Sequence, residues 1–371
     1  MTGMPGIPPV DLRLQHREVA EEIARGFEAV LSDTSFILGR AVTDFEKAYA
    51  EFTGARHCIG VANGTDALEL ALRAAGADAE TEVLVPANTF IATALAVARA
   101  GARPVLVDCD PDFYLMDVEQ AAAHVTRRTR FIMPVHLYGQ MAPTERLDAL
   151  AAANGLAIIE DAAQAQGARR RGRMAGTWGL AAGTSFYPGK NLGAYGDGGA
   201  VLTKSDELAK KIRALRNYGS EVKYHHPETG FNSRLDSLQA VVLSAKLKRL
   251  GAWNAARQDA ARRYDALLAN VPGVTLPRTL DGNDHVYHLY VVRVPNRDDV
   301  LKRLNADGVG AQIHYPVPIH LQGAFQHLGQ GEGSFPVAEK AAREILSLPM
   351  FPGITAEQQG RVADSLRRAL A

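Results

Sequence analysis

The chain of 371 residues is 47% hydrophobic and 22% charged, the composition of a globular protein with room for two or three domains. Its 41 basic and 41 acidic residues give a formal net charge of zero, which disfavours a general nucleic-acid or anionic-membrane binder. Two cysteines are too few for a disulfide framework or a zinc site, and we expect no metal. Because the N-terminus lacks a signal-peptide pattern, we expect a cytoplasmic protein.

Short apolar runs alternate with helical patterns from about residue 57. The patterns predict strands at 58–63, 82–87, 104–109, 131–136, 157–162, 184–188 and 199–204, and helices at 65–76, 89–101 and 144–155. This alternation predicts an α/β fold in which helices flank both faces of a mixed, mostly parallel sheet. We interpret the basic run at 168–173 as a solvated hairpin tip.

The pattern changes towards the C-terminus. Residues 234–268 predict one or two long helices, followed by a strand at 288–294, a helix at 297–308, a strand at 309–315 and terminal helices. We therefore expect a large domain with an N-terminal arm over residues 1–250 and a smaller C-terminal α+β domain over residues 251–371.

A single lysine, Lys190, lies in the glycine-rich segment SFYPGKNLGAYGDGGA at 185–200. It could bind phosphate, have no role on the surface, or act through its amine. A P-loop is disfavoured, because five residues separate Gly183 from Gly189 and Asn191 stands where a hydroxyl residue is required. GAYGDGGA is not a dinucleotide motif either, since it precedes a strand and not a helix.

A lysine amine that acts covalently can form a Schiff base with pyridoxal phosphate (PLP). Such a site also needs groups that bind the phosphate, a carboxylate beside the pyridine nitrogen and an aromatic or apolar face against the ring. Gly64 and Thr65 form a strand-to-helix turn, where Thr65 offers an N-cap and a hydroxyl to a phosphate, and Ser185 offers a second hydroxyl. Many strand-to-helix turns without a ligand have the same Gly-Thr pattern, so the turn alone is weak evidence for a phosphate site.

The carboxylate and the aromatic face have candidates at two other strand ends. Asp161, next to Glu160, is placed to pair with a protonated pyridine ring, although a helix cap is an equal alternative. Phe90 offers a face to a flat ring, although an aromatic side chain there more often belongs to the core. The combination is stronger than any single signal, because parallel strands end at one edge of the sheet.

Seven segments in this order resemble the DegT/DnrJ/StrS-type sugar aminotransferases, which are PLP enzymes of the aspartate-aminotransferase fold (fold type I): GTDAL, PANTFIATALAV, VHLYGQ, EDAAQAQGA, SFYPGKNLGAYGDGGAV, RNYGS and GFNSRLDSLQA. The resemblance covers nearly the whole chain. It implies that Lys190 forms a Schiff base with PLP and that Asp161 pairs with the ring nitrogen. It further implies the remaining cofactor contacts: Gln164 near the phenolic oxygen, Phe90 stacked on the ring, and Gly64, Thr65, Ser185 and Asn232 at the phosphate.

Asn232 is a residue that family members contribute across a dimer interface, so the resemblance also implies a homodimer with shared active sites. The implied reaction transfers an amino group from an amino acid, expected to be L-glutamate, through the PLP and pyridoxamine phosphate (PMP) forms to a nucleotide-linked keto-sugar. The lysine segment is most similar to that of enzymes acting at C3, here of a dTDP-3-keto-6-deoxyhexose. Segments similar to sugar-nucleotide contact regions suggest four substrate residues: Lys223, Tyr224, Tyr315 and His320.

Three alternatives stay open at this point. The first is an aminotransferase for a C4 or UDP-linked keto-sugar, or for a cyclitol. The second is a PLP-dependent sugar dehydratase, against which Lys190 speaks because relatives of that type carry histidine there. The third is a PLP-binding regulatory protein, which would normally carry a fused DNA-binding domain.

Overall fold

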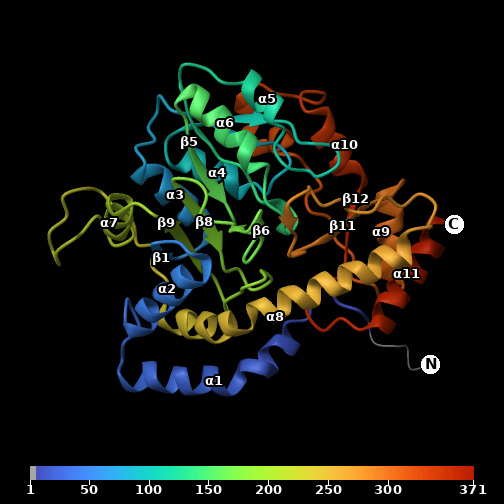
Figure 1. Ribbon diagram of the computed structural model, residues 1–371, viewed down its shortest axis with the longest axis horizontal. Coiled ribbons are helices and arrows are strands. Elements are labelled where there is room, and N and C mark those ends of the chain that lie inside the picture. The colour runs from blue at the N-terminus through green and yellow to red at the C-terminus, as the bar shows by residue number, and fades with distance from the viewer. Residues whose placement is uncertain (1–5) are drawn as a thin grey trace.

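A mixed seven-stranded sheet lies at the centre of the protein, as seen in a computed structural model that describes residues 6–371 (Figure 1). Its order is β1-β9-β8-β5-β4-β2-β3, and its strands are His57–Val61 (β1), Glu82–Pro86 (β2), Arg103–Val107 (β3), Thr129–Ile132 (β4), Ala157–Asp161 (β5), Ala181–Ser185 (β8) and Gly199–Thr203 (β9). β9 runs antiparallel to its neighbours β1 and β8, and the other neighbouring pairs are parallel. The expected mixed, mostly parallel sheet is confirmed.

Helices cover both faces of the sheet, which explains why its strands are almost continuously apolar in sequence. In β2, Val83 and Val85 pack with side chains of α3, α4 and α7, whereas Leu84 between them packs with α5 and α6. α2 and part of α8 cover the end of the second face. These helices are Arg40–Thr53 (α2), Gly64–Ala74 (α3), Ala92–Arg99 (α4), Val118–Ala123 (α5), Thr144–Asn154 (α6), Asp206–Leu215 (α7) and Ser237–Leu268 (α8).

A second hydrophobic core is formed mainly by residues after 260. Its elements are Tyr290–Arg293 (β11), Arg297–Ala306 (α9), Ile345–Leu348 (β12) and Ala356–Leu370 (α11). The helix Pro336–Glu344 (α10) precedes β12 and places Ala338 in the core of the large sheet. β11 and β12 pair antiparallel. The smaller elements are Arg169–Arg170 (β6), Arg173–Met174 (β7) and Asn283–Asp284 (β10), with short helical turns at Leu137–Gly139 (η1), Ile319–Leu321 (η2) and Gly323–Leu328 (η3).

The long helix α8 joins the two cores, and α1 (Leu12–Ser32) packs along it (Figure 1). Residue 250, where we expected a domain boundary, lies inside this helix. Up to Leu250 the apolar side chains of α8 pack with the large sheet or with α1, and from Ala260 onwards they belong to the second core. This change of partners supports the division into residues 1–250 and 251–371, which we keep as a proposal.

Two local predictions were wrong. Residues 309–315 form no strand, because Val309 and Gln312 make only isolated bridges, to Ile7 and Ser347, and the apolar run of β12 takes the place beside β11. The basic hairpin is real, but Arg170 in it is buried and donates to Glu145 at 2.8 Å. A basic run in sequence therefore did not mean that every one of its side chains was solvated.

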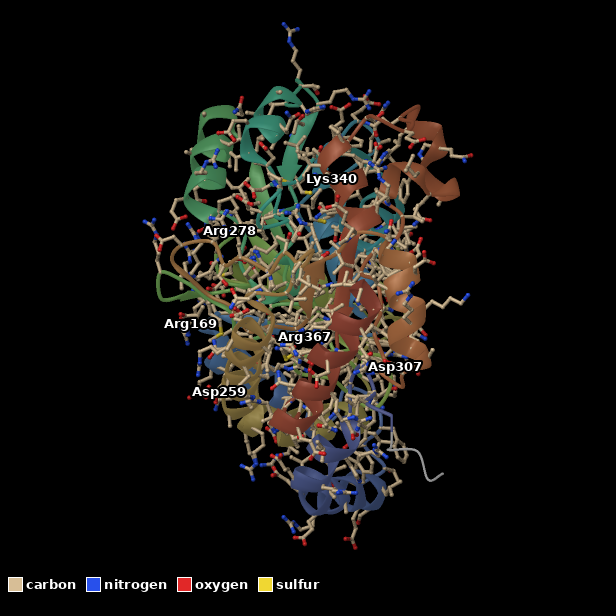
Figure 2. The ribbon with its side chains drawn as sticks, turned by 90° about the vertical axis from the view of Figure 1, so that its right-hand side faces the viewer. Arg169, Asp259, Arg278, Asp307, Lys340 and Arg367 are labelled. Atoms are coloured by element: carbon tan, nitrogen blue, oxygen red, sulfur yellow. The ribbon has the colours of Figure 1, made fainter. Side chains whose placement is uncertain are left out.

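The surface carries charges of both signs. The six residues labelled in Figure 2 are exposed and lie apart on one face: Arg169, Asp259, Arg278, Asp307, Lys340 and Arg367. Both cysteines, Cys58 and Cys109, are buried and free. Within residues 6–371, no helix is both long enough and apolar enough to cross a lipid bilayer.

Candidate functional site

A cavity of about 580 Å³ opens at the carboxyl ends of the parallel strands. Eight of the residues selected from sequence line it: Gly64, Thr65, Phe90, Asp161, Gln164, Ser185, Lys190 and Tyr315. They come from five separate strand ends and loops of the chain. The tertiary structure therefore brings together most of the residues that the sequence motifs indicated one by one.

The N-terminus of α3 forms one wall of the cavity. Asn63 is its N-cap, with Oδ1 accepting the Asp66 N–H at 2.8 Å, so our assignment of the cap to Thr65 was wrong. A Cβ on Gly64 would lie 2.6 Å from Cβ of Ser185, so only glycine lets these two segments approach so closely. Because the first N–H groups of a helix lack partners within it, this turn and the Ser185 hydroxyl form a cradle suited to a phosphate.

Asp161 ends β5 and points into the cavity. Its Oδ2 accepts from the Thr93 hydroxyl at 2.8 Å, and its Oδ1 accepts from the Ala163 N–H at 3.1 Å. Burial raises the pKa of Asp161, although Thr93, Ala163 and the charge of Lys190 oppose this shift. A buried carboxylate of this kind gains most from a cationic partner, such as a protonated ring nitrogen.

Lys190 reaches the same cavity from an irregular loop. Its backbone N–H donates to the carbonyl of Tyr187 at 2.8 Å, and a Cβ on Gly193 would lie 2.2 Å from the carbonyl oxygen of Pro188, so the loop folds back tightly on itself. The Lys190 amine makes no hydrogen bond with any described residue. Burial lowers the pKa of Lys190 to about 8, against the charge of Asp161, and this makes the amine a usable base near neutral pH.

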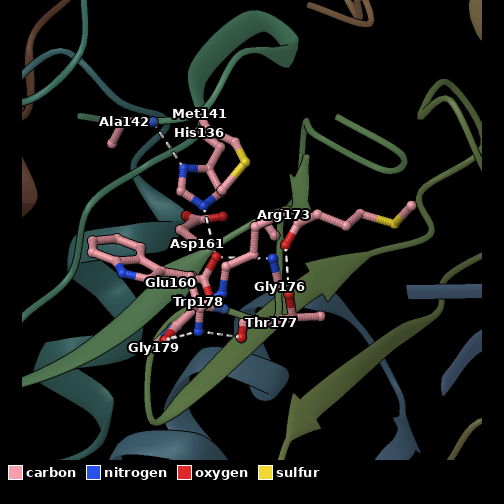
Figure 3. A network of polar contacts seen from close by, with 12 residues as sticks. His136, Met141, Ala142, Glu160, Asp161, Arg173, Gly176, Thr177, Trp178 and Gly179 are labelled. Carbon is pink, nitrogen blue, oxygen red and sulfur yellow. Dashed lines mark hydrogen bonds and ion pairs between the residues drawn. The ribbon is translucent and has the colours of Figure 1, made fainter. Parts of the chain in front are cut away.

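Glu160, beside Asp161 in sequence, faces away from the cavity because successive side chains of a strand point to opposite faces. Figure 3 shows its carboxylate in a closed network. It accepts from the backbone N–H groups of Gly176, Trp178 and Gly179 and from His136 Nε2, at 2.7–2.8 Å. Glu160 is therefore structural, and Asp161 is the carboxylate available for chemistry.

Aromatic and amide side chains form another wall of the cavity. The rings of Phe90 and Tyr315 lie 5.1 Å apart, and Phe90 is 50% exposed, so its face is available to a ligand. Gln164 accepts from the Tyr138 N–H through Oε1 at 2.7 Å and donates through Nε2 to the Tyr315 hydroxyl at 3.0 Å. Gln164 therefore connects the end of β5 to the wall that carries Tyr315.

The other four selected residues lie outside this cavity. Lys223 and Tyr224 are on an exposed loop, where the Lys223 ammonium lies 5.0 Å from the centre of the Tyr224 ring, and Asn232 is also exposed. His320 is buried, with Nε2 2.9 Å from Glu339 Oε1 and its ring against Phe335. Within one chain the structure therefore does not bring these residues to the site, and the position of His320 makes direct substrate contact implausible.

Sequence reasoning missed several residues that line the cavity. Thr93 follows Phe90 by one helical turn, so its position after β2 could have revealed it. His288 and His314 come from the C-terminal part of the chain, and Pro9 comes from the segment before α1. Nothing in their local sequence places them near Lys190, since only the packing of the second core against the large sheet does so.

The sequence profile of the DegT/DnrJ/EryC1/StrS aminotransferase family matches residues 17–367. The chain belongs to this family. Aminotransferases of this family use PLP, and the residues present fit that cofactor, because the cavity combines an unbonded lysine amine, a buried carboxylate, an aromatic face and a helix N-terminus kept open by Gly64. The fold assignment from the resemblance is confirmed.

Three curated relatives cover nearly the whole chain. A pleiotropic regulatory protein of Geobacillus stearothermophilus is 47% identical over 97% of both chains. A dTDP-3-amino-3,4,6-trideoxy-alpha-D-glucose transaminase of Micromonospora megalomicea is 47% identical over 96% of this chain and 97% of its own. A UDP-N-acetyl-3-dehydro-alpha-D-glucosamine 3-aminotransferase of Acidithiobacillus ferrooxidans is 46% identical over 100% of both.

Solved structures agree with this relationship. DesV of S. venezuelae, solved in complex with a ketimine intermediate, superposes with a TM-score of 0.96 at 45% identity, covering 98% of both chains. NtdA of Bacillus subtilis, solved with bound PMP, superposes with a TM-score of 0.90 at 32% identity, covering 100% of this chain and 86% of that one.

Proposed function

We propose that this protein transfers the amino group of an amino acid, L-glutamate, to C3 of a dTDP-linked 3-keto-6-deoxyhexose. The juxtaposition of Lys190 and Asp161 in one cavity carries this proposal, because a base and a buried carboxylate are the two groups that amino transfer through PLP requires. The transaminase relatives of similar identity act on nucleotide-linked sugars and are named for position 3, which supports the same substrate class and carbon.

The described residues divide the cofactor-binding work between them. Gly64, Thr65 and Ser185 would hold the phosphate, and Asp161 would pair with the ring nitrogen. Bound PLP supplies an aldehyde that condenses with amines and a protonated ring that takes up the electron pair left when a carbon loses its proton. The aromatic face of Phe90 would lie against the ring.

Lys190 is the group that moves protons. Once its amine is free, Lys190 removes the proton from Cα of the donor amino acid and delivers a proton to the cofactor. When the keto-sugar is bound, Lys190 moves the proton in the opposite direction, from the cofactor to the sugar carbon. Its lowered pKa keeps a useful fraction of the amine neutral at pH 7–8. Thr93 holds Asp161 in place throughout, because its hydroxyl donates to the carboxylate.

We also propose that the working unit is a homodimer with shared sites. Asn232, Lys223 and Tyr224 are exposed and lie outside the cavity of their own chain, which is the placement expected of residues that serve a partner's site. Analytical ultracentrifugation gives the oligomeric state. Mixing Lys190→Ala and Asn232→Ala subunits tests sharing, because a mixed dimer would regain one intact site.

The test of function begins with reduction of the purified protein by borohydride and peptide mapping, where we expect a pyridoxyl group on Lys190. L-Glutamate alone should convert the bound cofactor to PMP, and a dTDP-3-keto-6-deoxyhexose should restore PLP with one amino-sugar formed per cycle. Lys190→Ala should abolish turnover. A sugar consumed without amino product would indicate a dehydratase, and binding without turnover would indicate a regulatory protein. Faster reaction with UDP-linked or 4-keto substrates would replace the proposed acceptor.

A further inference from the structure

A buried network links the residue after the lysine to the cavity wall. Asn191 is 1% exposed, and its Nδ2 lies 2.9 Å from Asn254 Oδ1 and 3.1 Å from the carbonyl oxygen of Val286. Its Oδ1 lies 3.2 Å from His288 Nδ1. Asn254, on α8, places Nδ2 2.9 Å from the carbonyl oxygen of Gln166.

Two backbone carbonyls fix every donor and acceptor in this network, because a carbonyl oxygen can only accept. The carbonyl of Gln166 requires Asn254 to present Nδ2 to it and Oδ1 to Asn191. The carbonyl of Val286 requires Asn191 to present Nδ2 in the same way. Asn191 Oδ1 therefore faces His288, and His288 Nδ1 must carry the proton and donate it.

A neutral imidazole that is protonated at Nδ1 has an acceptor lone pair at Nε2. Burial and the charges of Lys190, Arg257 and His314 hold the pKa of His288 well below its ordinary value, so the ring stays neutral. His288 lines the same cavity as Lys190, and the described residues offer its Nε2 no hydrogen bond.

His314, the other histidine of the cavity wall, differs in this respect. Its Nδ1 lies 2.8 Å from the hydroxyl of Ser347, which can donate or accept, so neither tautomer is imposed. His288 is thus the cavity histidine whose acceptor is fixed by the fold. The Lys190 ammonium, on a half-buried side chain, is a donor with no partner among the described residues.

We propose that His288 Nε2 accepts a hydrogen bond from the Lys190 ammonium, and that Asn191 is the positioning residue that fixes the His288 tautomer. The role, which rests on the proposed function of Lys190, is to stabilise the protonated amine while Lys190 carries a proton between Cα of the amino acid and the cofactor. Asn191, which follows Lys190 in the same loop, thereby helps to hold the lysine side chain towards the cavity through His288.

The first measurement is the tautomer itself. Full-length protein labelled with ¹⁵N-histidine and saturated with PMP, which leaves Lys190 free, is examined by long-range ¹H–¹⁵N correlation, and His288→Gln identifies the His288 signals by their loss. We expect the Nδ1–H pattern in the wild type and a mixture of tautomers in Asn191→Ala. Asn254→Ala is the matched control, because Val286 still orients the Asn191 amide and the pattern should persist.

The second measurement is the pKa of Lys190 in the same form, from the pH dependence of its acetylation rate and peptide mass spectrometry. His288→Phe removes the acceptor and should lower this pKa by about one unit, from about 8 to about 7, which makes the neutral fraction at pH 7 roughly fivefold larger. His288→Gln, whose amide oxygen can accept, should restore most of the difference. Circular dichroism confirms that each variant is folded.

An Nε2–H tautomer in the wild type, or an unchanged Lys190 pKa in folded His288→Phe, would overturn the assignment. If His288→Phe does not fold, the tautomers of the wild type and of Asn191→Ala decide the question. Neither measurement uses the sugar substrate, so an error in the proposed reaction would be seen separately, as a missing amino-sugar product.

Discussion

Replacing Glu160 by glutamine removes one of the two acceptor oxygens that receive four donors, three of them buried and one, the Gly179 N–H, partly buried. If the new amide nitrogen replaces Oε1, the N–H groups of Trp178 and Gly179 lose their acceptor. If it replaces Oε2, Gly176 and His136 lose theirs. His136 cannot adapt by changing tautomer at no cost, because its Nδ1 already accepts from the Ala142 N–H at 3.1 Å.

Two donors, at least one of them fully buried, therefore lose their partner in either orientation. Each such loss costs about 1–3 kcal/mol, so we expect a decrease of roughly 2–6 kcal/mol in the free energy of unfolding. That is a large part of the 5–15 kcal/mol that is typical of folded proteins, as an order of magnitude. The neighbouring Asp161 would lose its support on the rear face of β5, and we expect weaker PLP binding as well.

The assay is guanidinium chloride unfolding followed by circular dichroism, with Glu119→Gln as the matched control. Glu119 pairs with Arg146 at the surface, so its substitution should move the midpoint only slightly. A midpoint for Glu160→Gln within error of that control would refute the reasoning.

The pH dependence provides a second check of the same network. Burial alone would raise the pKa of Glu160, but the bonds from His136 and from the backbone N–H groups outweigh it and the pKa lies below its ordinary value. A carboxylate with a depressed pKa contributes stability above its unfolded pKa, about 4.3, and loses it as the pH falls through the folded pKa. The stability difference between wild type and Glu160→Gln should therefore shrink in acid below about pH 4.

Three further outcomes are expected. Asp161→Asn should leave a folded protein whose turnover falls about a hundredfold or more, measured by steady-state kinetics, and normal turnover would exclude Asp161 as the partner of the ring nitrogen. Gly64→Ala should weaken PLP binding, measured by fluorescence titration, because its Cβ would clash with Ser185. The control Gly251→Ala in α8 has nothing within 4 Å of the new Cβ, so it should bind PLP normally and gain about 1 kcal/mol of stability. The rate of the L-glutamate half-reaction should rise with pH through about 8, as Lys190 loses its proton, and a flat profile over pH 7–9 would contradict its role as the base.

Local sequence determined the elements of the large sheet. The strands of the large sheet are mostly buried on both faces and so read as short apolar runs between helices, which is why most of their positions along the chain were predicted. Because parallel strands end at one edge, the same pattern predicted that Gly64, Asp161 and Lys190 would meet. The resemblance to a known family then indicated PLP as the cofactor that we propose these residues hold.

Other features depend on contacts that no local pattern records. The strand expected at 309–315 lost its place to β12, because pairing beside β11 is decided by the packing of the second core. His288 entered the site, and His320 was buried against Glu339, for the same reason. The sequence by itself indicated most of the cavity residues that the large sheet provides, since each follows a recognisable strand. Only the tertiary structure decided which residues after α8 reach Lys190, because that depends on how the second core packs against the large sheet.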